Sequence, residues 1–310
     1  MKTFTCAGFA IALAMLAGCG GSQNAATSVE PQPSFGLPLT ASRDTSQSGA
    51  LLYVVGTGHV YIFTYPKGGL VGQTTIYDGS DDCSDKNGDV FVTGEDSISV
   101  FAHGDTKPYR KLSVPGDAYA CSIDPTTGNL AVLGTVGVMV FKKAKGHYEL
   151  LYNSTFVPRQ CGYDNKGNLF VDGYLYSKFK FAELPKGSAN FIEISVGQDI
   201  VGGEVQWDGK YITVEDDGGY GVATIYRLQV SGSRATIAGK TRLTQAAMMP
   251  LLSWIYDGAI IIPYSIGSGY KDIAVGFWNY PAGGKAIKTI AKGFHSPEAL
   301  SAVTISAAPK

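Results

Sequence analysis

One supersecondary unit recurs along most of this chain, and a repeat constrains the fold more strongly than any single motif. In each copy the third strand ends in an aromatic residue, a turn of Gly, Pro and Lys follows, and another strand comes after it. The aromatics of the six copies are spaced 38, 40, 40, 45 and 52 residues apart, at Phe63, Phe101, Phe141, Phe181, Tyr226 and Trp278. Ahead of five copies lies a hairpin with Asp and Gly at its turn, residues that tolerate the positive φ of tight turns.

Four strands every ~40–50 residues predict the blades of a β-propeller. Counting the copies gives an all-β domain of six blades over residues 50–306. The first blade lacks its first strand, because the chain enters at LLYVV (51–55), while SPEALSAVTIS (296–306) is a strand without a sheet of its own. We therefore expect the C-terminal strand to pair into the N-terminal blade and close the ring. A seventh, irregular blade within residues 248–290 is the alternative.

The hairpin DNKGNLFV (164–171) resembles the blade hairpin of the six-bladed NHL, SMP-30/gluconolactonase and virginiamycin B lyase-like propellers. The rhythm matches over the whole domain, and the motif itself recurs in blades two to four. In SMP-30-like lactonases, a divalent cation is held by Glu, Asn and Asp at the channel mouth. The resemblance therefore implies that Glu204 and Asp172 could take such parts, although the Asn ligands have no counterpart here.

The N-terminus has the pattern of an exported lipoprotein. Lys2 precedes an apolar run that is too short to span a bilayer, and LAGC (16–19) resembles the bacterial lipobox. Cys19 carries the only thiol there that can take a thioether-linked lipid. We expect lipidation at Cys19 after removal of a signal peptide at 1–18. An ordinary secreted protein is the alternative.

The remaining boundaries follow from composition. Residues 19–49 are rich in Ser, Thr, Gln, Pro and Gly, which predicts a flexible tether between the lipid and the propeller. Residues 307–310 form a short C-terminal tail. Gly20, rather than Asp, after the lipidated cysteine favours the outer membrane as the place of the anchor. We expect a monomer held in the bacterial cell envelope.

Three cysteines remain in the mature chain besides Cys19, and each falls on the innermost strand of one of three consecutive blades. They are Cys83, Cys121 and Cys161. Three thiols facing one channel could hold a soft metal such as zinc or copper(I). We favour a role as small buried apolar residues, because the inner strands of adjacent blades are expected to diverge. An odd number of thiols is not a disulfide framework.

Charge is more informative than any catalytic motif. The formal net charge of −1 argues against a nucleic-acid partner. Propeller topology places one set of hairpin turns and the connections between blades on the same face, which we call the acidic face. His59 and His295 belong to this face, as do the candidate binding carboxylates Asp81, Asp82, Glu95, Asp96, Asp172, Glu204, Glu215, Asp216 and Asp217.

These residues predict a binding or interaction module rather than an enzyme. An acidic mouth concentrates cations or a cationic partner, and oxygen ligands favour Ca²⁺ over zinc. The ligand itself, a small molecule or a protein, is left open. The alternative is a divalent-metal-dependent lactonase or lyase. Such an enzyme should gather Glu204, Asp172 or another carboxylate with His59 or His295 around an open mouth. A binding module should leave these groups scattered around a rim.

Overall fold

A computed structural model describes residues 49–151, 155–216, 223–244, 252–266, 272–295 and 299–308. Contacts divide the chain into residues 1–40 and 41–310, and everything described belongs to the second unit. The predicted signal peptide, Cys19, most of the tether and Asp217 lie outside the described residues. No helix within the described ranges is long and apolar enough to cross a membrane.

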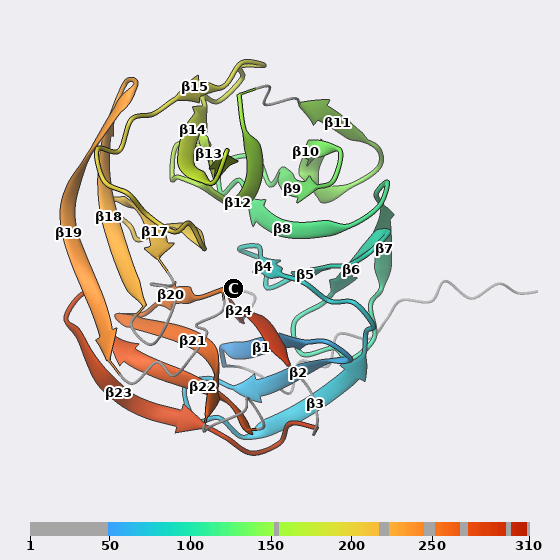
Figure 1. The fold of residues 1–310 in the computed structure, drawn as a ribbon. Coiled ribbons are helices and arrows are strands. Elements are labelled where there is room, and N and C mark those ends of the chain that lie inside the picture. Colours follow the sequence, from blue (N-terminus) through green and yellow to red (C-terminus); the bar gives the residue numbers. More distant parts are fainter. Residues whose placement is uncertain are drawn as a thin grey trace, which may run out of the picture. The chain divides into compact units, whose positions relative to one another are not determined.

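The described residues form six four-stranded antiparallel blades (Figure 1). The strands of blade 1 are β24 (Leu300–Ser306), β1 (Leu51–Gly56), β2 (His59–Thr64) and β3 (Leu70–Thr75). Those of blade 2 are β4 (Asp82–Ser84), β5 (Val90–Thr93), β6 (Ser97–Phe101) and β7 (Arg110–Ser113). Those of blade 3 are β8 (Ala118–Ile123), β9 (Leu130–Gly134), β10 (Gly137–Phe141) and β11 (Tyr148–Leu151), with the 3₁₀ turn η1 (Lys142–Ala144).

The second half of the ring repeats the arrangement. The strands of blade 4 are β12 (Val157–Tyr163), β13 (Leu169–Leu175), β14 (Lys178–Leu184) and β15 (Ile192–Glu193). Those of blade 5 are β16 (Val205–Trp207), β17 (Ile212–Asp216), β18 (Thr224–Ser231) and β19 (Arg234–Thr244). Those of blade 6 are β20 (Trp254–Tyr256), β21 (Ala259–Ile266), β22 (Asp272–Asn279) and β23 (Gly283–Ile290). A short parallel pairing of β19 with β23 joins the outer edges of blades 5 and 6.

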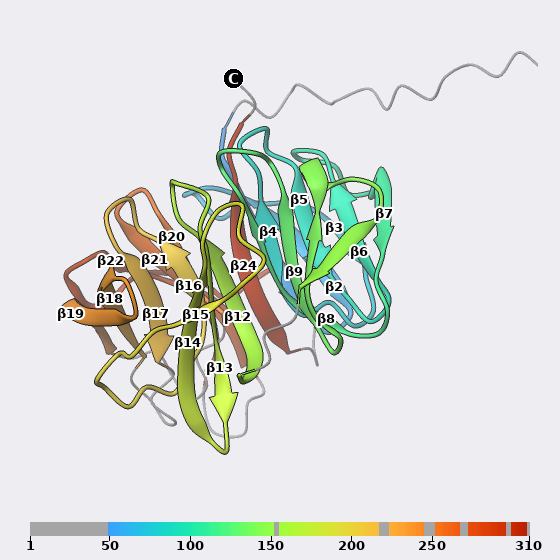
Figure 2. The same ribbon diagram turned by 90° about the horizontal axis from the view of Figure 1, so that it is seen from above.

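The ring closes as the sequence predicts. β24 pairs antiparallel with β1, from Leu51 opposite Ser306 to Val55 opposite Ala302. Figure 2 shows β24 running through the middle of the domain, and it contacts β4 of blade 2 and β20 and β21 of blade 6. The described residues between 252 and 290 form one blade, so the alternative of seven blades is wrong.

The repeated aromatics form the packing between blades. Phe63, Phe101, Phe141, Phe181 and Trp278 are fully buried, each in an apolar cluster. Burying a side chain of this size contributes roughly 1.5–3 kcal/mol relative to leaving it exposed. The period found in the sequence is therefore the period of the core, because every blade inserts one large ring against its neighbour.

The Asp and Gly of the first hairpins have a direct structural role. In blade 4, Asp164 Oδ1 accepts hydrogen bonds from the backbone N–H groups of Lys166 and Asn168, at 2.8 and 2.9 Å. Gly167 then takes a φ of +86°, a conformation that a side chain would strain. Asp85 makes the equivalent bonds in blade 2. The motif thus builds a turn, as its resemblance to other propeller hairpins implied.

One expectation about the cysteines is wrong. Cys83 of β4 and Cys121 of β8 form a disulfide, with their Cα atoms 5.8 Å apart. The inner strands of adjacent blades do not diverge where they approach the axis, so the two thiols can meet. Cys161 is free and buried, which agrees with the expected role of a small apolar residue.

Candidate functional site

Five of the predicted acidic residues are buried around the propeller axis instead of ringing its mouth. They are Asp81, Asp82, Asp172, Glu204 and Glu215, and none has more than 6% of its surface exposed. The charges of Asp81, Glu215, Asp172 and Asp82 all raise the pKa of Glu204, after burial itself, so the group is electrostatically connected. The prediction of one surface ring is therefore corrected: the inner part of the set is enclosed.

Three of these carboxylates connect successive blades through backbone hydrogen bonds. Asp81, just before β4, accepts a bond of 2.9 Å from the Cys121 N–H in β8 of blade 3. Asp172 of β13 accepts bonds from Gln160 in its own blade, at 2.9 Å, and from Gly203 next to blade 5, at 3.1 Å.

The third carboxylate continues the same pattern. Glu215 of β17 accepts a bond of 3.2 Å from the Ser253 N–H, just before blade 6. Gln206 of β16 adds two contacts across the same boundary, donating to the Ser253 carbonyl and accepting from the Ile255 N–H, each at 2.8 Å. The polar groups near the axis thus hold neighbouring blades together.

Burial raises the pKa of these carboxyl groups strongly. It brings the pKa of Asp172 to about 8, although the N–H groups of Gln160 and Gly203 lower it. It brings the pKa of Asp81 to about 7, against the opposing effect of the Cys121 N–H. Burial, followed by the charge of Asp81, raises the pKa of Asp82 well above its usual range. Much of this group is therefore protonated near neutral pH, because low-dielectric surroundings disfavour the carboxylate.

The structure brings the two predicted histidines together. The rings of His59 in β2 and His295 before β24 stack with their centroids 4.4 Å apart and planes at 12°. The side-chain Nε2 of Gln73 lies 2.7 Å from Nε2 of His295. The backbone N–H of His295 donates to the Tyr61 hydroxyl at 3.0 Å. The stacked imidazoles thus bring β2 of blade 1 together with residues 294–295, which follow blade 6 in the chain. They share this place with the rings of Tyr61 and Phe294.

The remaining predicted carboxylates occupy different places on the molecule. Glu95 and Asp96 are exposed in the hairpin between β5 and β6. Asp216 ends β17, where its Oδ1 accepts a bond of 3.3 Å from the Val201 N–H. Across the described residues, no group of three or more His, Cys, Asp or Glu side chains is placed to hold a metal ion. Binding of Ca²⁺ on this face stays a prediction, because Ca²⁺ also takes backbone and amide oxygens as ligands.

Two adjoining hollows lie on the acidic face between blades 1 and 2. The larger has a volume of about 440 Å³ and includes Asp78, Glu95 and Asp117 in its lining. The smaller, of about 340 Å³, shares Asp78 and Glu95 and adds Asp96 and Lys111. Tyr77, with 77% of its surface exposed, borders the smaller one. Glu95 and Asp96 were predicted from the sequence to lie on one face, but not in a shared hollow.

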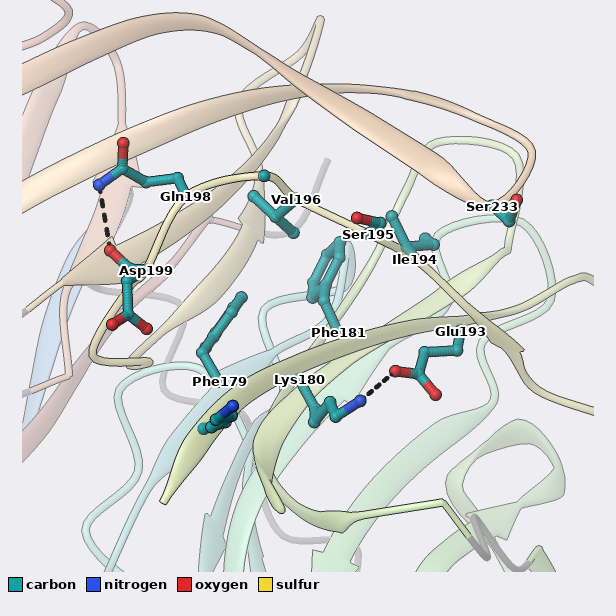
Figure 3. Close-up of a pocket in the computed structure, with 12 residues that line it drawn as sticks. Phe179, Lys180, Phe181, Glu193, Ile194, Ser195, Val196, Gln198, Asp199 and Ser233 are labelled. Carbon is teal, nitrogen blue, oxygen red and sulfur yellow. Dashed lines mark hydrogen bonds and ion pairs between the residues drawn. The ribbon is translucent and has the colours of Figure 1, made fainter. Parts of the chain in front are cut away.

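A third concavity was not foreseen from the sequence. It lies at the outer side of blades 4 and 5, has a volume of about 660 Å³, and is lined by β14 and by residues 193–199 (Figure 3). The sequence gives no signal for it, because FIEISV (191–196) has the pattern of a full strand, whereas in the structure only Ile192–Glu193 form β15.

The fold and these surfaces define a six-bladed β-propeller. Comparison of structures agrees: 723 solved chains match significantly. Two examples are a protein of unknown function from Bacteroides caccae and hydrazine synthase from Kuenenia stuttgartiensis. The first has a TM-score of 0.59 and 14% identity, covering 84% of this chain and 99% of that one. The second has a TM-score of 0.51 and 14% identity, covering 71% and 70%. At such identities the likeness concerns the fold alone.

Sequence comparisons add no family. No protein-family profile matches the chain, and no curated protein matches it significantly. The structure alone therefore defines the class of protein, a β-propeller. The role of the protein must be inferred from its own surfaces.

Proposed function

We propose that this chain is a non-enzymatic binding module of the bacterial cell envelope that takes a cationic ligand or protein partner on its acidic face. The observation that carries the proposal is the pair of hollows between blades 1 and 2. Three carboxylates line the larger hollow, and none of its described lining residues is a cation. In the smaller hollow Lys111 is the single cation among the described lining residues.

The physical reason is that a concave, acidic surface focuses the electrostatic potential. Carboxylates around a hollow attract a cationic group and speed its approach, particularly at low ionic strength. The exposed ring of Tyr77 can add a cation–π contact at the border. A Lys or Arg side chain or an organic amine fits this chemistry better than a bare metal ion, since no described ligand group is placed for a metal.

The proposal includes the location and the relationship that the sequence predicts. The protein would be exported, lipidated at Cys19 and held in the outer membrane, with residues 19–49 as the tether. It would belong to the NHL, SMP-30 and virginiamycin B lyase-like propellers. The Asp-x-x-Gly turns of blades 2 and 4, and the turn of blade 3 that is one residue longer between Asp124 and Gly128, support that relationship, with positive φ at Gly88, Gly167 and Gly128.

The alternative is a metal-dependent lactonase or lyase. Its support is the raised pKa of Asp172, caused first by burial, since perturbed acids gather at catalytic sites. Against it, Asp172 is fully buried and already accepts two backbone hydrogen bonds. The predicted histidines lie in another place, stacked on each other. Metal analysis of the purified protein separates the two functions, because the enzyme requires a retained divalent ion.

Binding to the hollows can be tested with a labelled lysine-rich peptide and fluorescence anisotropy. The double variant Glu95→Gln/Asp96→Asn should weaken binding about three- to tenfold, with a smaller dependence on salt. The control Glu149→Gln/Asp257→Asn removes the same charge from exposed positions outside the hollows and should change little. Equal weakening by both variants would reduce the acidic face to a general surface potential, and absence of peptide binding would contradict the proposal.

A further inference from the structure

Blade 4 differs from the other blades in how little of its third strand is covered. The outer strand pairs with five residues of β2 in blade 1, four of β6 in blade 2 and four of β10 in blade 3. The outer strand pairs with eight residues of β18 in blade 5 and with four of β22 in blade 6. In blade 4, β15 pairs only with Ala182 and Glu183, although β14 has seven residues. No described strand therefore pairs with the outer edge at Lys178–Lys180.

The chain leaves this edge because it pairs with the next blade. The Ile194 N–H still donates to the Phe181 carbonyl, at 2.8 Å. Immediately afterwards Ser195 forms a parallel bridge with Arg234 of blade 5. The Ser195 N–H donates to the Ser233 carbonyl, and the Ala235 N–H donates to the Ser195 carbonyl, each at 2.9 Å. Residues 196–199 then form the far wall of the groove in Figure 3.

The open edge presents backbone groups to the groove. In an antiparallel strand, the N–H and C=O of alternate residues point to the same side. The Phe181 carbonyl points outward to Ile194, so the N–H and C=O of Phe179 also point outward. No described residue forms a backbone hydrogen bond to Phe179 on that side. An uncovered strand edge is a template for an added strand.

The side chains around the edge differ between its two faces. The rings of Phe179 and Phe181 stack with centroids 6.3 Å apart, and with Ile194 and Val196 they make an apolar lining. Lys178 and Lys180 occupy the alternate positions. Lys180 forms an ion pair with Glu193, whereas Lys178 has no ion-pair partner among the described residues. An added strand would therefore meet an apolar face on one side and a basic face on the other.

We propose that the outer edge of β14 receives an extended segment of another protein, with alternating apolar and acidic residues, that completes the fourth strand of blade 4. A second copy of this chain is a poor occupant. Symmetric pairing centred on Phe179 would place Lys178 of one copy opposite Lys180 of the other, and like charges directly opposite destabilise a strand pair. This surface is separate from the hollows between blades 1 and 2.

The experiment uses the full-length protein and three labelled seven-residue peptides. One alternates Val and Glu, one alternates Val and Lys, and one has the Val and Glu residues in separate blocks. Fluorescence anisotropy should show binding of the alternating Val/Glu peptide. In the Glu95→Gln/Asp96→Asn background, which weakens binding of cationic peptides to the acidic hollows, the other two should bind at least about tenfold more weakly, because strand addition requires both alternation and matching charge. Failure of the Val/Glu peptide to bind would overturn the proposal.

Substitutions locate the site. Lys178→Glu should weaken the Val/Glu peptide about three- to tenfold and strengthen the Val/Lys peptide. Lys145→Glu, which makes the same charge change in an exposed turn of blade 3, should do neither. Asp199→Asn should tighten the Val/Glu peptide slightly, because Asp199 lies on the opposite wall. Equal effects of Lys178→Glu and Lys145→Glu would place binding elsewhere.

Hydrogen exchange then tests the mode of binding. Addition of the Val/Glu peptide should slow exchange of the Phe179 amide, which points into the groove, beyond that of its neighbours Lys178 and Lys180. Binding without this protection would mean that the peptide docks through side chains alone, which contradicts strand addition. Melting temperatures of all variants should be measured first, so that a loss of folding is not taken for a loss of binding.

Discussion

The axis and the outer edge of blade 4 are opposite extremes in the same ring of blades. Near the axis, a disulfide, three carboxylates and Gln206 connect one blade to the next. At the outer edge of blade 4, β15 pairs with two of the seven residues of β14, and one further hydrogen bond joins the Ile194 N–H to the Phe181 carbonyl. Buried polar groups need hydrogen-bond partners, and uncovered strand edges can pair with an added strand. We therefore assign stability to the axis and, as proposed above, binding to the edge.

The largest expected effect comes from opening the ring. Deletion of residues 296–310 removes β24 and with it Leu300, Ala302, Val303 and Ile305, all of which are buried. It also exposes the edge of β1. We expect loss of cooperative unfolding of the whole domain, because roughly 1.5–3 kcal/mol is lost for each large apolar side chain. Deletion of residues 20–48 should leave the melting temperature nearly unchanged. Circular dichroism on heating measures both, and similar effects would contradict closure by β24.

A second prediction concerns the two phenylalanines that border the groove. Phe181 is fully buried, so Phe181→Ala should lower the free energy of unfolding by about 3–5 kcal/mol. Phe179 is only partly buried at the open edge, and Phe179→Ala should cost clearly less. Denaturant titration of both variants sharpens the boundary between the packed interior and the exposed edge. A larger loss for Phe179→Ala would mean that the edge is part of the core.

A third prediction concerns the bond between blades 2 and 3. Cys83 and Cys121 close a loop of 38 residues, and removing such a link typically costs about 2–4 kcal/mol. Cys83→Ala/Cys121→Ala should therefore lower stability more than Cys161→Ala, which removes a free buried thiol. Mass measurement after alkylation should show two protected cysteines in the wild type. If Cys83, Cys121 and Cys161 all react with the alkylating agent in the unfolded protein without reductant, the disulfide is ruled out.

Much of the fold was predictable because the repeat and the core have the same period. Each copy contributes its aromatic to the packing between blades, and each Asp-Gly turn fixes a hairpin, so counting copies counted blades. The closing strand followed from the missing first strand of blade 1. These signals are local in sequence, which is why one sequence was enough to find them.

The candidate site was less predictable because it depends on distances across the axis. Topology assigned Asp81, Asp172 and Glu215 to the acidic face, but which of them are enclosed depends on how far the inner strands converge. The same convergence lets Cys83 reach Cys121, 38 residues away. His59 and His295 could be paired from the sequence, since closure of blade 1 fixes both. The uncovered edge of β14 depends on the bridge from Ser195 to blade 5, which no local pattern announces.

The central claim is that the axial carboxyl groups are structural and that burial favours their protonated forms, most clearly at Asp172. Their raised folded-state pKa values, about 7 for Asp81 and about 8 for Asp172, exceed the usual value near 4 in an unfolded chain. The folded state therefore binds more protons between pH 4 and 8, and the free energy of unfolding should fall as pH rises through that window. The contribution is complete below about pH 4 and lost as the groups ionise.

The most direct measurement is urea unfolding of the wild type and Asp172→Asn at several values between pH 4 and 8. The account predicts that the wild type loses stability with rising pH, by up to about 1.4 kcal/mol per pH unit for each proton held. Asp172→Asn should be less stable, and its free energy of unfolding should fall less steeply with pH. The difference in slope should correspond to about one bound proton. A wild type that gains stability with rising pH, with that gain reduced in Asp172→Asn, would mean that Asp172 is ionised and would contradict the account.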